Sequence, residues 1–389
     1  MQPELIADCV HCGFCLPTCP TYTLWHEEMD SPRGRIHLMS GLVDGTIDLT
    51  DTVVEHFDRC LGCMACVPAC PSGVQYDRLI ETTRAHIEER QRRGVGERLL
   101  RRLIFEVIPH RRRLRAALAL RRLPAPGPLR PLRQIAPPWV SARWPPEHLP
   151  GPGPRVALVA GCVQSVVFGD VNAATARVLA ADGFDVHVPR AQGCCGALHA
   201  HAGRLEEGVA RARELERSLR GYDAIVTNAA GCGSHLKDHG IEGVVDVSEL
   251  LADAPLRAER HRLAIRVAFQ DSCHLKHAQR LEAEPRAVLG AIPGLTVLEP
   301  GDQALCCGSA GIYNLVQPDA ASELGDRKAE RVLATEPEAY ASGNPGCLVQ
   351  VTAALRRAGK PLPAFHPIEL ADASIRGLDA RAVLAAARR

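Results

Sequence analysis

The sequence predicts a multidomain chain of the α plus α/β class, in which an all-helical N-terminal domain is followed by two duplicated α/β domains with parallel sheets. Two observations predict this. Near the N-terminus, the same cysteine spacing occurs twice, and the roughly forty residues between the two runs have helical apolar spacing. Beyond residue 155, an order of apolar strand, cysteine and helix runs through the chain twice.

Composition narrows the class of protein. The chain has 389 residues, of which 46% are hydrophobic and 23% charged, as in ordinary globular proteins. A net charge of +1 and an aromatic content of 4% argue against nucleic-acid binding. We find neither a signal peptide nor an apolar run long enough to span a membrane. Sixteen cysteines in such a chain favour metal ligands over disulfides, and we expect a cytoplasmic protein.

Both N-terminal cysteine runs have the spacing C-x-x-C-x-x-C-x-x-x-C-P, which is typical of [4Fe–4S] ferredoxins. Three thiolates of one run can surround one cubane cluster, with Gly13 and Gly62 easing the tight turns. In two-cluster proteins, the fourth cysteine ligates the other cluster. We therefore assign one cluster to Cys9, Cys12, Cys15 and Cys70, and the other to Cys60, Cys63, Cys66 and Cys19. Structural zinc on paired C-x-x-C motifs is the alternative, but it does not require the complete doubled spacing.

The segment between the two cysteine runs predicts helices. Ser31 is a suitable N-cap with Pro32 at the first helical position, and Thr50 or Asp51 can cap a second helix. We therefore predict a helical ferredoxin domain over residues 1–90. It resembles the ferredoxin domain of succinate dehydrogenase iron–sulfur subunits.

Residues 91–154 are predicted to be a basic helical segment followed by a linker. The stretch from about Thr82 to Leu123 has helical character and is rich in arginine, and the linker from Pro124 to Pro154 is dense in proline. The basic stretch favours either a face that docks a partner or a membrane surface, or a solvated helix without a partner. Its prominent arginines are Arg90, Arg92, Arg93, Arg111, Arg112 and Arg113.

The remaining chain is predicted to hold two cysteine-rich domains, over residues 155–260 and 261–389, each with a Cys-Cys-Gly motif (C-C-G). The predicted strands are 156–160, 186–188 and 224–227 in the first copy, and 265–269, 296–298 and 339–341 in the second. Each strand is followed closely by one cysteine or by the C-C-G motif. Because open α/β sheets bind ligands at the carboxyl ends of their strands, we expect four cysteines of each copy to converge there.

The converging cysteines are predicted to hold metal. Inert buried cysteines are the alternative, but two matching sets of four make that interpretation unattractive. We expect at least one further iron–sulfur cluster, while zinc or a redox-active dithiol stays open. The two predicted ligand sets are Cys162, Cys194, Cys195 and Cys232, and Cys273, Cys306, Cys307 and Cys347.

These motifs, together with the segments 8–15, 30–36 and 58–61, resemble the iron–sulfur subunit of glycolate oxidase over nearly the whole chain. The resemblance implies an electron-transfer subunit of an oxidoreductase complex. A partner subunit would oxidise glycolate to glyoxylate at FAD, and the clusters of this chain would pass the electrons to a quinone-type acceptor. We find no dinucleotide fingerprint and no catalytic residue, so we expect FAD only in the partner and no activity of this chain alone. At most, peripheral membrane association is expected.

Other functions stay open. The iron–sulfur subunit of a lactate or glycerol-3-phosphate dehydrogenase would have similar motifs, and so would a heterodisulfide-reductase-like subunit. The latter uses a fifth cysteine in each C-C-G unit, where this chain has His235 and Gln350. A non-enzymatic interaction protein would not need two ferredoxin clusters. Five histidines could be ligands or proton carriers, although a surface or core role is favoured for each: His11, His26, His199, His201 and His274.

Overall fold

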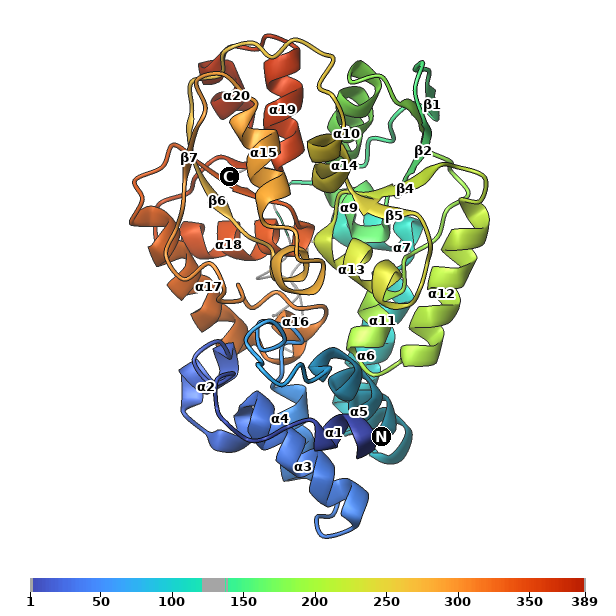
Figure 1. The fold of residues 1–389 in the computed structure, drawn as a ribbon, viewed down its shortest axis with the longest axis vertical. Helices are drawn as coiled ribbons and strands as arrows, with labels where there is room; N and C mark the ends of the chain where they lie inside the picture. The colour runs from blue at the N-terminus through green and yellow to red at the C-terminus, as the bar shows by residue number, and fades with distance from the viewer. Residues whose placement is uncertain (1–2, 121–136, 138, 388–389) are drawn as a thin grey trace.

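A computed structural model describes residues 3–120, 137 and 139–387 (Figure 1). The helical N-terminal part lies at one end of the molecule, and two α/β lobes lie side by side above it. This arrangement confirms the predicted fold class. The exact domain boundaries stay a prediction.

The N-terminal part consists of helices joined by loops that carry the two cysteine runs. Its elements are α1 (Pro3–Ala7), α2 (Pro20–Trp25), the 3-10 helix η1 (Glu28–Asp30), α3 (Pro32–Asp44), α4 (Asp51–Asp58) and α5 (Tyr76–Arg90). The predicted caps are present, since Ser31 Oγ accepts a hydrogen bond from the Gly34 amide at 3.0 Å, and Thr50 Oγ1 accepts one from the Val53 amide at 3.4 Å. The core between α3, α4 and α5 is apolar and includes Met39, Phe57 and Leu79.

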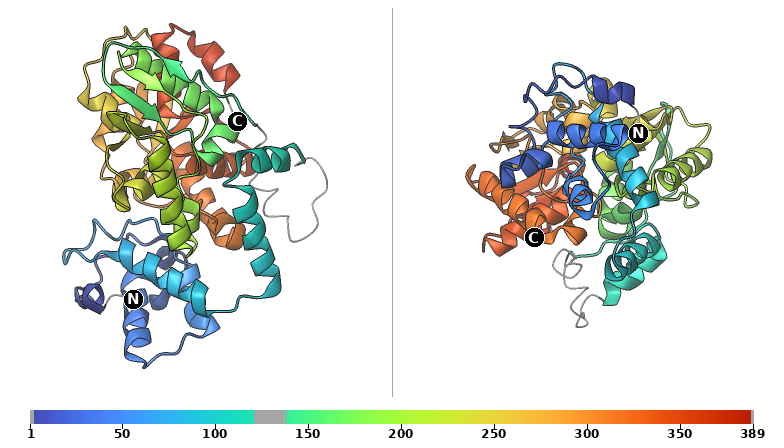
Figure 2. Two further views of the ribbon diagram at one scale, coloured as in Figure 1. Left: turned by 90° about the vertical axis from the view of Figure 1, so that its right-hand side faces the viewer. Right: turned by 90° about the horizontal axis from the view of Figure 1, so that it is seen from below.

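The basic stretch is not one continuous helix. It consists of the end of α5, then α6 (Val95–Val107) and α7 (Arg111–Ala119), which run along the side of the upper lobes (Figure 2). Gly94 and Pro109 lie in the two breaks, where neither residue type favours a helix interior. Three of the prominent arginines are engaged within the chain: Arg93 forms ion pairs with three acidic side chains, Arg111 lies 3.8 Å from the centre of the Trp144 ring, and Arg113 pairs with Glu106.

The predicted linker lies partly outside the described residues. Its described end is packed rather than free, because Trp139 and Trp144 contact the core of the first lobe. The Trp144 indole donates a hydrogen bond to the Val188 carbonyl at 3.3 Å. Proline content predicted a spacer here, but these aromatic side chains anchor the segment to the lobe.

The first α/β lobe contains a five-stranded sheet in the order β1-β3-β2-β4-β5. Its elements are β1 (His148–Leu149), β2 (Arg155–Leu158), α9 (Cys162–Val167), α10 (Gly169–Ala181), β3 (Asp185–His187), α11 (Ala197–His201), α12 (Leu205–Ser218), β4 (Ala224–Thr227), α13 (Ala230–Asp238), β5 (Val244–Asp246) and α14 (Val247–Asp253). Strands β2 to β5 are parallel, as predicted. The edge strand β1 is antiparallel to β3. It was not predicted, because two residues are too few to show an alternation of apolar and polar side chains.

The second lobe repeats this topology with an entirely parallel sheet in the order β7-β6-β8-β9. Its elements are β6 (Arg266–Gln270), the π-helix η4 (His274–Ala278), α15 (Ala283–Gly290), β7 (Thr296–Leu298), α16 (Tyr313–Val316), α17 (Pro318–Leu333), β8 (Ala339–Ser342), α18 (Pro345–Arg357), β9 (Ala364–Phe365), α19 (Pro367–Ile375) and α20 (Ala380–Ala386). In both lobes, the first long strand lies between the second and the third. The order in which successive strands are added therefore reverses beside the first long strand of each sheet. Open α/β sheets bind ligands at this switch point.

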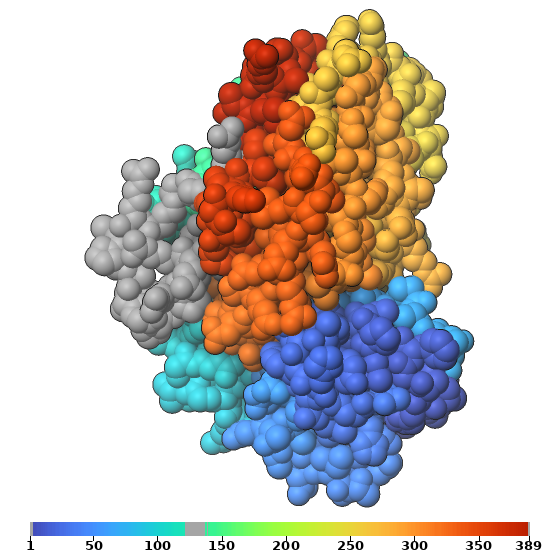
Figure 3. Space-filling model, turned by 90° about the vertical axis from the view of Figure 1, so that its left-hand side faces the viewer, coloured from blue at the N-terminus to red at the C-terminus, as the bar shows by residue number. Residues whose placement is uncertain are grey.

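The three parts pack closely. One apolar core runs through both lobes, including Phe168 and Phe269, and Arg177 pairs with Asp372 across the lobes at 2.6 Å. The helical part lies against the lower end of the second lobe, as the space-filling view shows (Figure 3). Within the described part of the chain, no helix is both long and apolar enough to cross a membrane.

Candidate metal centres

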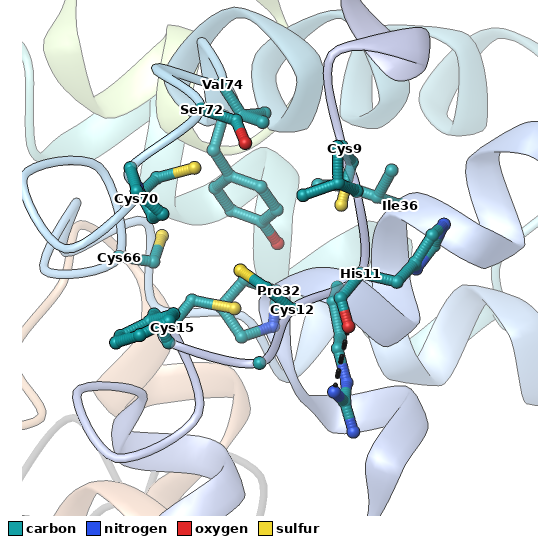
Figure 4. A pocket seen from close by; sticks show the side chains of 16 residues that line it. Cys9, His11, Cys12, Cys15, Pro32, Ile36, Cys66, Cys70, Ser72 and Val74 are labelled. Carbon is teal, nitrogen blue, oxygen red and sulfur yellow. Dashed lines mark hydrogen bonds between the residues drawn. The ribbon is translucent and has the colours of Figure 1, made fainter.

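The first ferredoxin-type site is a cavity close to the surface. Its wall includes Cys9, Cys12 and Cys15 from the first run, and Cys66 and Cys70 from the second. The sulfur atoms of these cysteines turn towards a common space (Figure 4). All sixteen cysteines lie in the described residues. Of these sixteen, Cys12 is exposed, and the others are buried or half-buried.

The second ferredoxin-type site lies deeper. The cavity wall contains all four cysteines that we assigned to this cluster: Cys19, Cys60, Cys63 and Cys66. Each of these four is buried. Cys66 borders both cavities, whereas Cys70 lines the first and Cys19 lines the second. These positions support cross-ligation by the fourth cysteine of each run, which stays a prediction.

The two cysteine runs have the same backbone shape. Two residues after the first cysteine of a run, φ is positive at His11 and Gly62, and two residues later it is positive again at Gly13 and Met64. A positive φ costs a residue other than glycine on the order of 1–3 kcal/mol of conformational free energy. The backbone is therefore strained at His11 and Met64. Such strain at the same two positions of both loops indicates that each loop is shaped to enclose a group.

A buried arginine lies beside the second site. Arg35 is 1% exposed, and its guanidinium donates to the His56 carbonyl at 2.6 Å and to Thr21 Oγ1 at 3.2 Å. Burial raises the pKa of the Cys60 thiol, but the charges of Arg35 and Arg84 outweigh burial, so that this pKa lies below its usual value. These two cations therefore favour negative charge on the Cys60 sulfur.

We expect Arg35→Gln to lower the reduction potential of the second ferredoxin cluster, because a nearby positive charge stabilises the reduced, more negative form. Coulomb's law at an effective dielectric constant of about 20 gives ~2 kcal/mol for a unit charge about 8 Å away. This energy corresponds to roughly 90 mV for one electron. Redox titration followed by electron paramagnetic resonance measures the shift.

The matched control is Arg33→Gln. Arg33 lies on the same helix, donates to the His11 carbonyl at 3.1 Å beside the first site, and pairs with Glu28 at 2.6 Å. This variant should shift the other cluster, and by less, since Arg33 is partly exposed whereas Arg35 is buried. Equal shifts of both clusters in either variant would contradict the assignment of one arginine to each site.

In the first C-C-G domain, the four predicted cysteines come together at the carboxyl ends of β2, β3 and β4. Cys162 begins α9, the C-C-G motif follows β3, and Cys232 lies in the first turn of α13. The sulfur of Cys194 is 3.5 Å from that of Cys162, and the sulfur of Cys195 is 3.2 Å from that of Cys232. These distances are too long for disulfides, which join sulfurs at about 2.05 Å.

The second C-C-G domain repeats this geometry at β6, β7 and β8. Hydrogen bonding by Cys306 raises the pKa of Cys307 to about 12, and burial contributes to the rise. The Asn344 amide lies 3.5 Å from the sulfur of Cys347. Burial lowers the pKa of the fully buried Lys328, and the charges of Cys307, Cys306 and Cys347 act against this shift, so the lysine side chain lies close to the cysteine group.

The second ferredoxin-type site adjoins the second C-C-G group. Cys63 and Cys306 belong to one buried apolar cluster together with Leu61 and Tyr313, and Cys273 packs against it. Burial raises the pKa of the Cys63 thiol, and the charge of Cys306 is the next contribution. Three cysteine groups therefore lie in a row, from the exposed Cys12 to the interior of the second lobe.

The cysteine groups fit iron–sulfur clusters better than free thiols. Burial holds the pKa of Cys63 and Cys66 well above the usual value, so that these thiols would be neutral and chemically idle without a metal. A cluster provides the positive charge that lets such thiolates form. The wrapped loops, the converging sulfurs and the buried cations Arg35 and Lys328 all suit a negatively charged cluster.

The two positions that replace a fifth cysteine differ in their surroundings. Gln350 hydrogen-bonds to the Ala321 carbonyl at 2.7 Å, and this amide links helices α17 and α18. His235 faces His239, with ring centres 4.5 Å apart, and Nε2 lies 3.4 Å from the Gly208 carbonyl. The charge of Cys194 acts to raise the pKa of His235, so this side chain lies near the first C-C-G group.

Of the five other histidines considered, His199, His201 and His274 are buried or nearly so between the parts of the chain. His11 and His26 have positive φ values in the N-terminal part.

The sequence analysis did not identify Arg35, Arg84 and Lys328, whose cationic groups lie beside the cysteine sulfurs. A buried cation has no local sequence signal, because only the fold brings it to the site.

The fold and the cysteine groups define an iron–sulfur protein in which a dicluster domain is joined to two cysteine-rich domains. The chain matches the family "4Fe-4S dicluster domain" over residues 5–74, and the family "Cysteine-rich domain" over residues 156–237 and 267–352. It is 35% identical to the "Probable glycolate oxidase iron-sulfur subunit" of Bacillus subtilis, covering 92% of this chain and 91% of that protein. It is 36% identical to the "Glycolate oxidase iron-sulfur subunit" of Escherichia coli, covering 96% and 95%.

The chain therefore belongs to the family of glycolate oxidase iron–sulfur subunits. Among solved structures, a hypothetical protein from Helicobacter pylori shares the fold, with a TM-score of 0.60 and 9% identity over 92% of this chain and 70% of that one. The family implies that the chain holds several iron–sulfur clusters as a subunit of an oxidoreductase.

Proposed function

We propose that this chain is the electron-transfer subunit of a flavin-dependent dehydrogenase that oxidises glycolate to glyoxylate and delivers the electrons to a quinone-type acceptor. The observation that carries the proposal is the row of cysteine groups, which runs from the surface at Cys12 to Cys306 in the interior. When bound, the clusters supply one-electron chemistry, while FAD in a partner subunit supplies the two-electron oxidation.

The residues proposed as ligands are the sixteen cysteines in the sets assigned above. The ferredoxin-type sets would each hold one [4Fe–4S] cluster, and each C-C-G set would hold one further centre. Closely spaced centres inside a low-dielectric core suit electron transfer, because little solvent reorganises around them. The neighbouring positions of Cys63 and Cys306 support a continuous connection between the ferredoxin part and the second lobe.

The surface near Cys12 is the proposed docking place for the flavoprotein. Val10 and Phe14, on either side of Cys12, are 68% and 67% exposed. Two exposed apolar side chains beside the most accessible cysteine group would be covered by a partner that exchanges electrons there. Peripheral membrane association of the complex is part of the proposal, with α7 as a basic element close to the surface.

The test is co-expression with the flavoprotein subunit encoded in the same organism, followed by anaerobic purification. We expect glycolate to reduce the iron–sulfur centres of the complex, as measured by low-temperature electron paramagnetic resonance. The isolated chain should contain no flavin and should stay oxidised with glycolate. Reduction by D- or L-lactate but not by glycolate would replace the proposed substrate, and stoichiometric FAD in the isolated chain would contradict the division of labour.

A further inference from the structure

A cluster of metal-ligating side chains outside the cysteine groups joins the ferredoxin part to the first C-C-G lobe. Glu81 lies on α5, His235 lies on α13, and His239 is the residue that ends α13. One ligand atom from each of these three side chains lies within 4.8 Å of the other two. Two histidines four positions apart on one helix share a face, as is common in metal sites.

One ring nitrogen of each histidine in this cluster lacks a hydrogen-bond partner. His235 is 2% exposed, and its Nδ1 is buried without a hydrogen bond, as is Nε2 of His239. Nε2 of His239 and Oε2 of Glu81 are 3.6 Å apart, which is too long for a hydrogen bond. Two ligands at about 2.0–2.1 Å on one tetrahedral metal are roughly 3.4 Å apart, so the observed separation suits a shared ion better than direct contact.

The surroundings favour a cation. Burial raises the pKa of Glu81 to about 7, with further contributions from the carboxylates of Asp238 and Asp77. Burial also lowers the pKa of His235 to about 4, which keeps its imidazole neutral and able to ligate. The nearby Arg84 cannot easily neutralise Glu81, because its guanidinium donates to the carbonyls of Cys60 and His201.

We propose that Glu81, His235 and His239 bind one divalent zinc-class ion that links the ferredoxin part to the first C-C-G lobe. Imidazole ligands exclude magnesium and calcium, which prefer oxygen, and zinc binds such a set more strongly than iron(II). Because Cys232 and His235 share helix α13, the ion would hold one ligand-bearing helix of the C-C-G group against α5. His235 therefore serves this site and not the adjacent cysteine group.

The experiment measures zinc and iron in the untagged full-length chain, purified anaerobically and dialysed. We expect about one tightly held zinc per chain, and an X-ray absorption spectrum at the zinc edge with nitrogen and oxygen neighbours at about 2.0–2.1 Å and no sulfur shell at about 2.3 Å. Glu81→Gln and His239→Ala should lose the zinc and keep the iron. The control His148→Ala, in an exposed histidine group elsewhere, should keep both.

A second variant distinguishes specific loss of the zinc ligand from misfolding of the chain. His239→Cys replaces one zinc ligand by another, so it should retain zinc and add one sulfur neighbour. Three outcomes would overturn the proposal: wild-type chain that holds no zinc after incubation with one equivalent of Zn²⁺, unchanged zinc in Glu81→Gln and His239→Ala, or zinc with only sulfur neighbours. Loss of iron in His235→Ala with zinc unaffected would also overturn it, since His235 would then serve the cysteine group.

Discussion

Replacing Cys70 by alanine is expected to destroy the cluster held by Cys9, Cys12 and Cys15, although Cys70 belongs to the other run. The reason is geometric, because Cys70 lines the same cavity as Cys9, Cys12 and Cys15. The iron content should fall by about four atoms per chain. Conversely, Cys19→Ala should remove the deeper cluster, since Cys19 lines the second cavity.

Matched variants make this result decisive. Cys12→Ala should leave the same residual resonance spectrum as Cys70→Ala, and Cys63→Ala the same spectrum as Cys19→Ala. Adding Arg35→Gln identifies the survivor, because this change should lower the potential of the cluster that remains in Cys70→Ala. A Cys70→Ala spectrum that matches Cys63→Ala would show that each run holds its own cluster.

The sequence was sufficient for features that depend on local spacing. The strands at 224–227 and 296–298 match β4 and β7 residue for residue, since apolar residues between turn-forming segments define them. The N-caps Ser31 and Thr50 were readable for the same reason. The convergence of Cys162, Cys194 and Cys232 followed from one general property of parallel sheets, whose carboxyl ends share an edge.

Features that depend on contacts between distant segments could not be predicted. The short edge strands β5 and β9 form only because a neighbouring strand offers hydrogen-bonding partners. The approach of Cys63 to Cys306 depends on how the helical part packs against the second lobe. Likewise, Glu81 and His239 belong to different parts of the chain and lie close together only in the folded protein. The sequence around either residue contains no motif that predicts this proximity.

The last expectation concerns the C-C-G groups. The iron content of the wild-type chain should lie well above the eight or so atoms of two [4Fe–4S] clusters. Cys307→Ala and Cys195→Ala should each lower it, because each removes a sulfur from the centre of one converging set of four. Wild-type iron near eight, with zinc at the cysteines, would contradict redox function in both lobes.

The two variants should then differ in their effect on electron flow. Cys307 belongs to the group that adjoins the second ferredoxin site through Cys306 and Cys63. In the complex, Cys307→Ala should leave glycolate-dependent reduction of the ferredoxin clusters intact. It should reduce electron delivery to a quinone analogue by at least tenfold, a change of about 1.4 kcal/mol.

Lys328→Met tests the same centre without removing a ligand. Loss of the lysine charge should lower the reduction potential of that centre and slow electron delivery less severely than Cys307→Ala does. Stopped-flow reduction followed by steady-state turnover separates the two steps, and unchanged turnover in Cys307→Ala would place the exit of electrons before the second lobe.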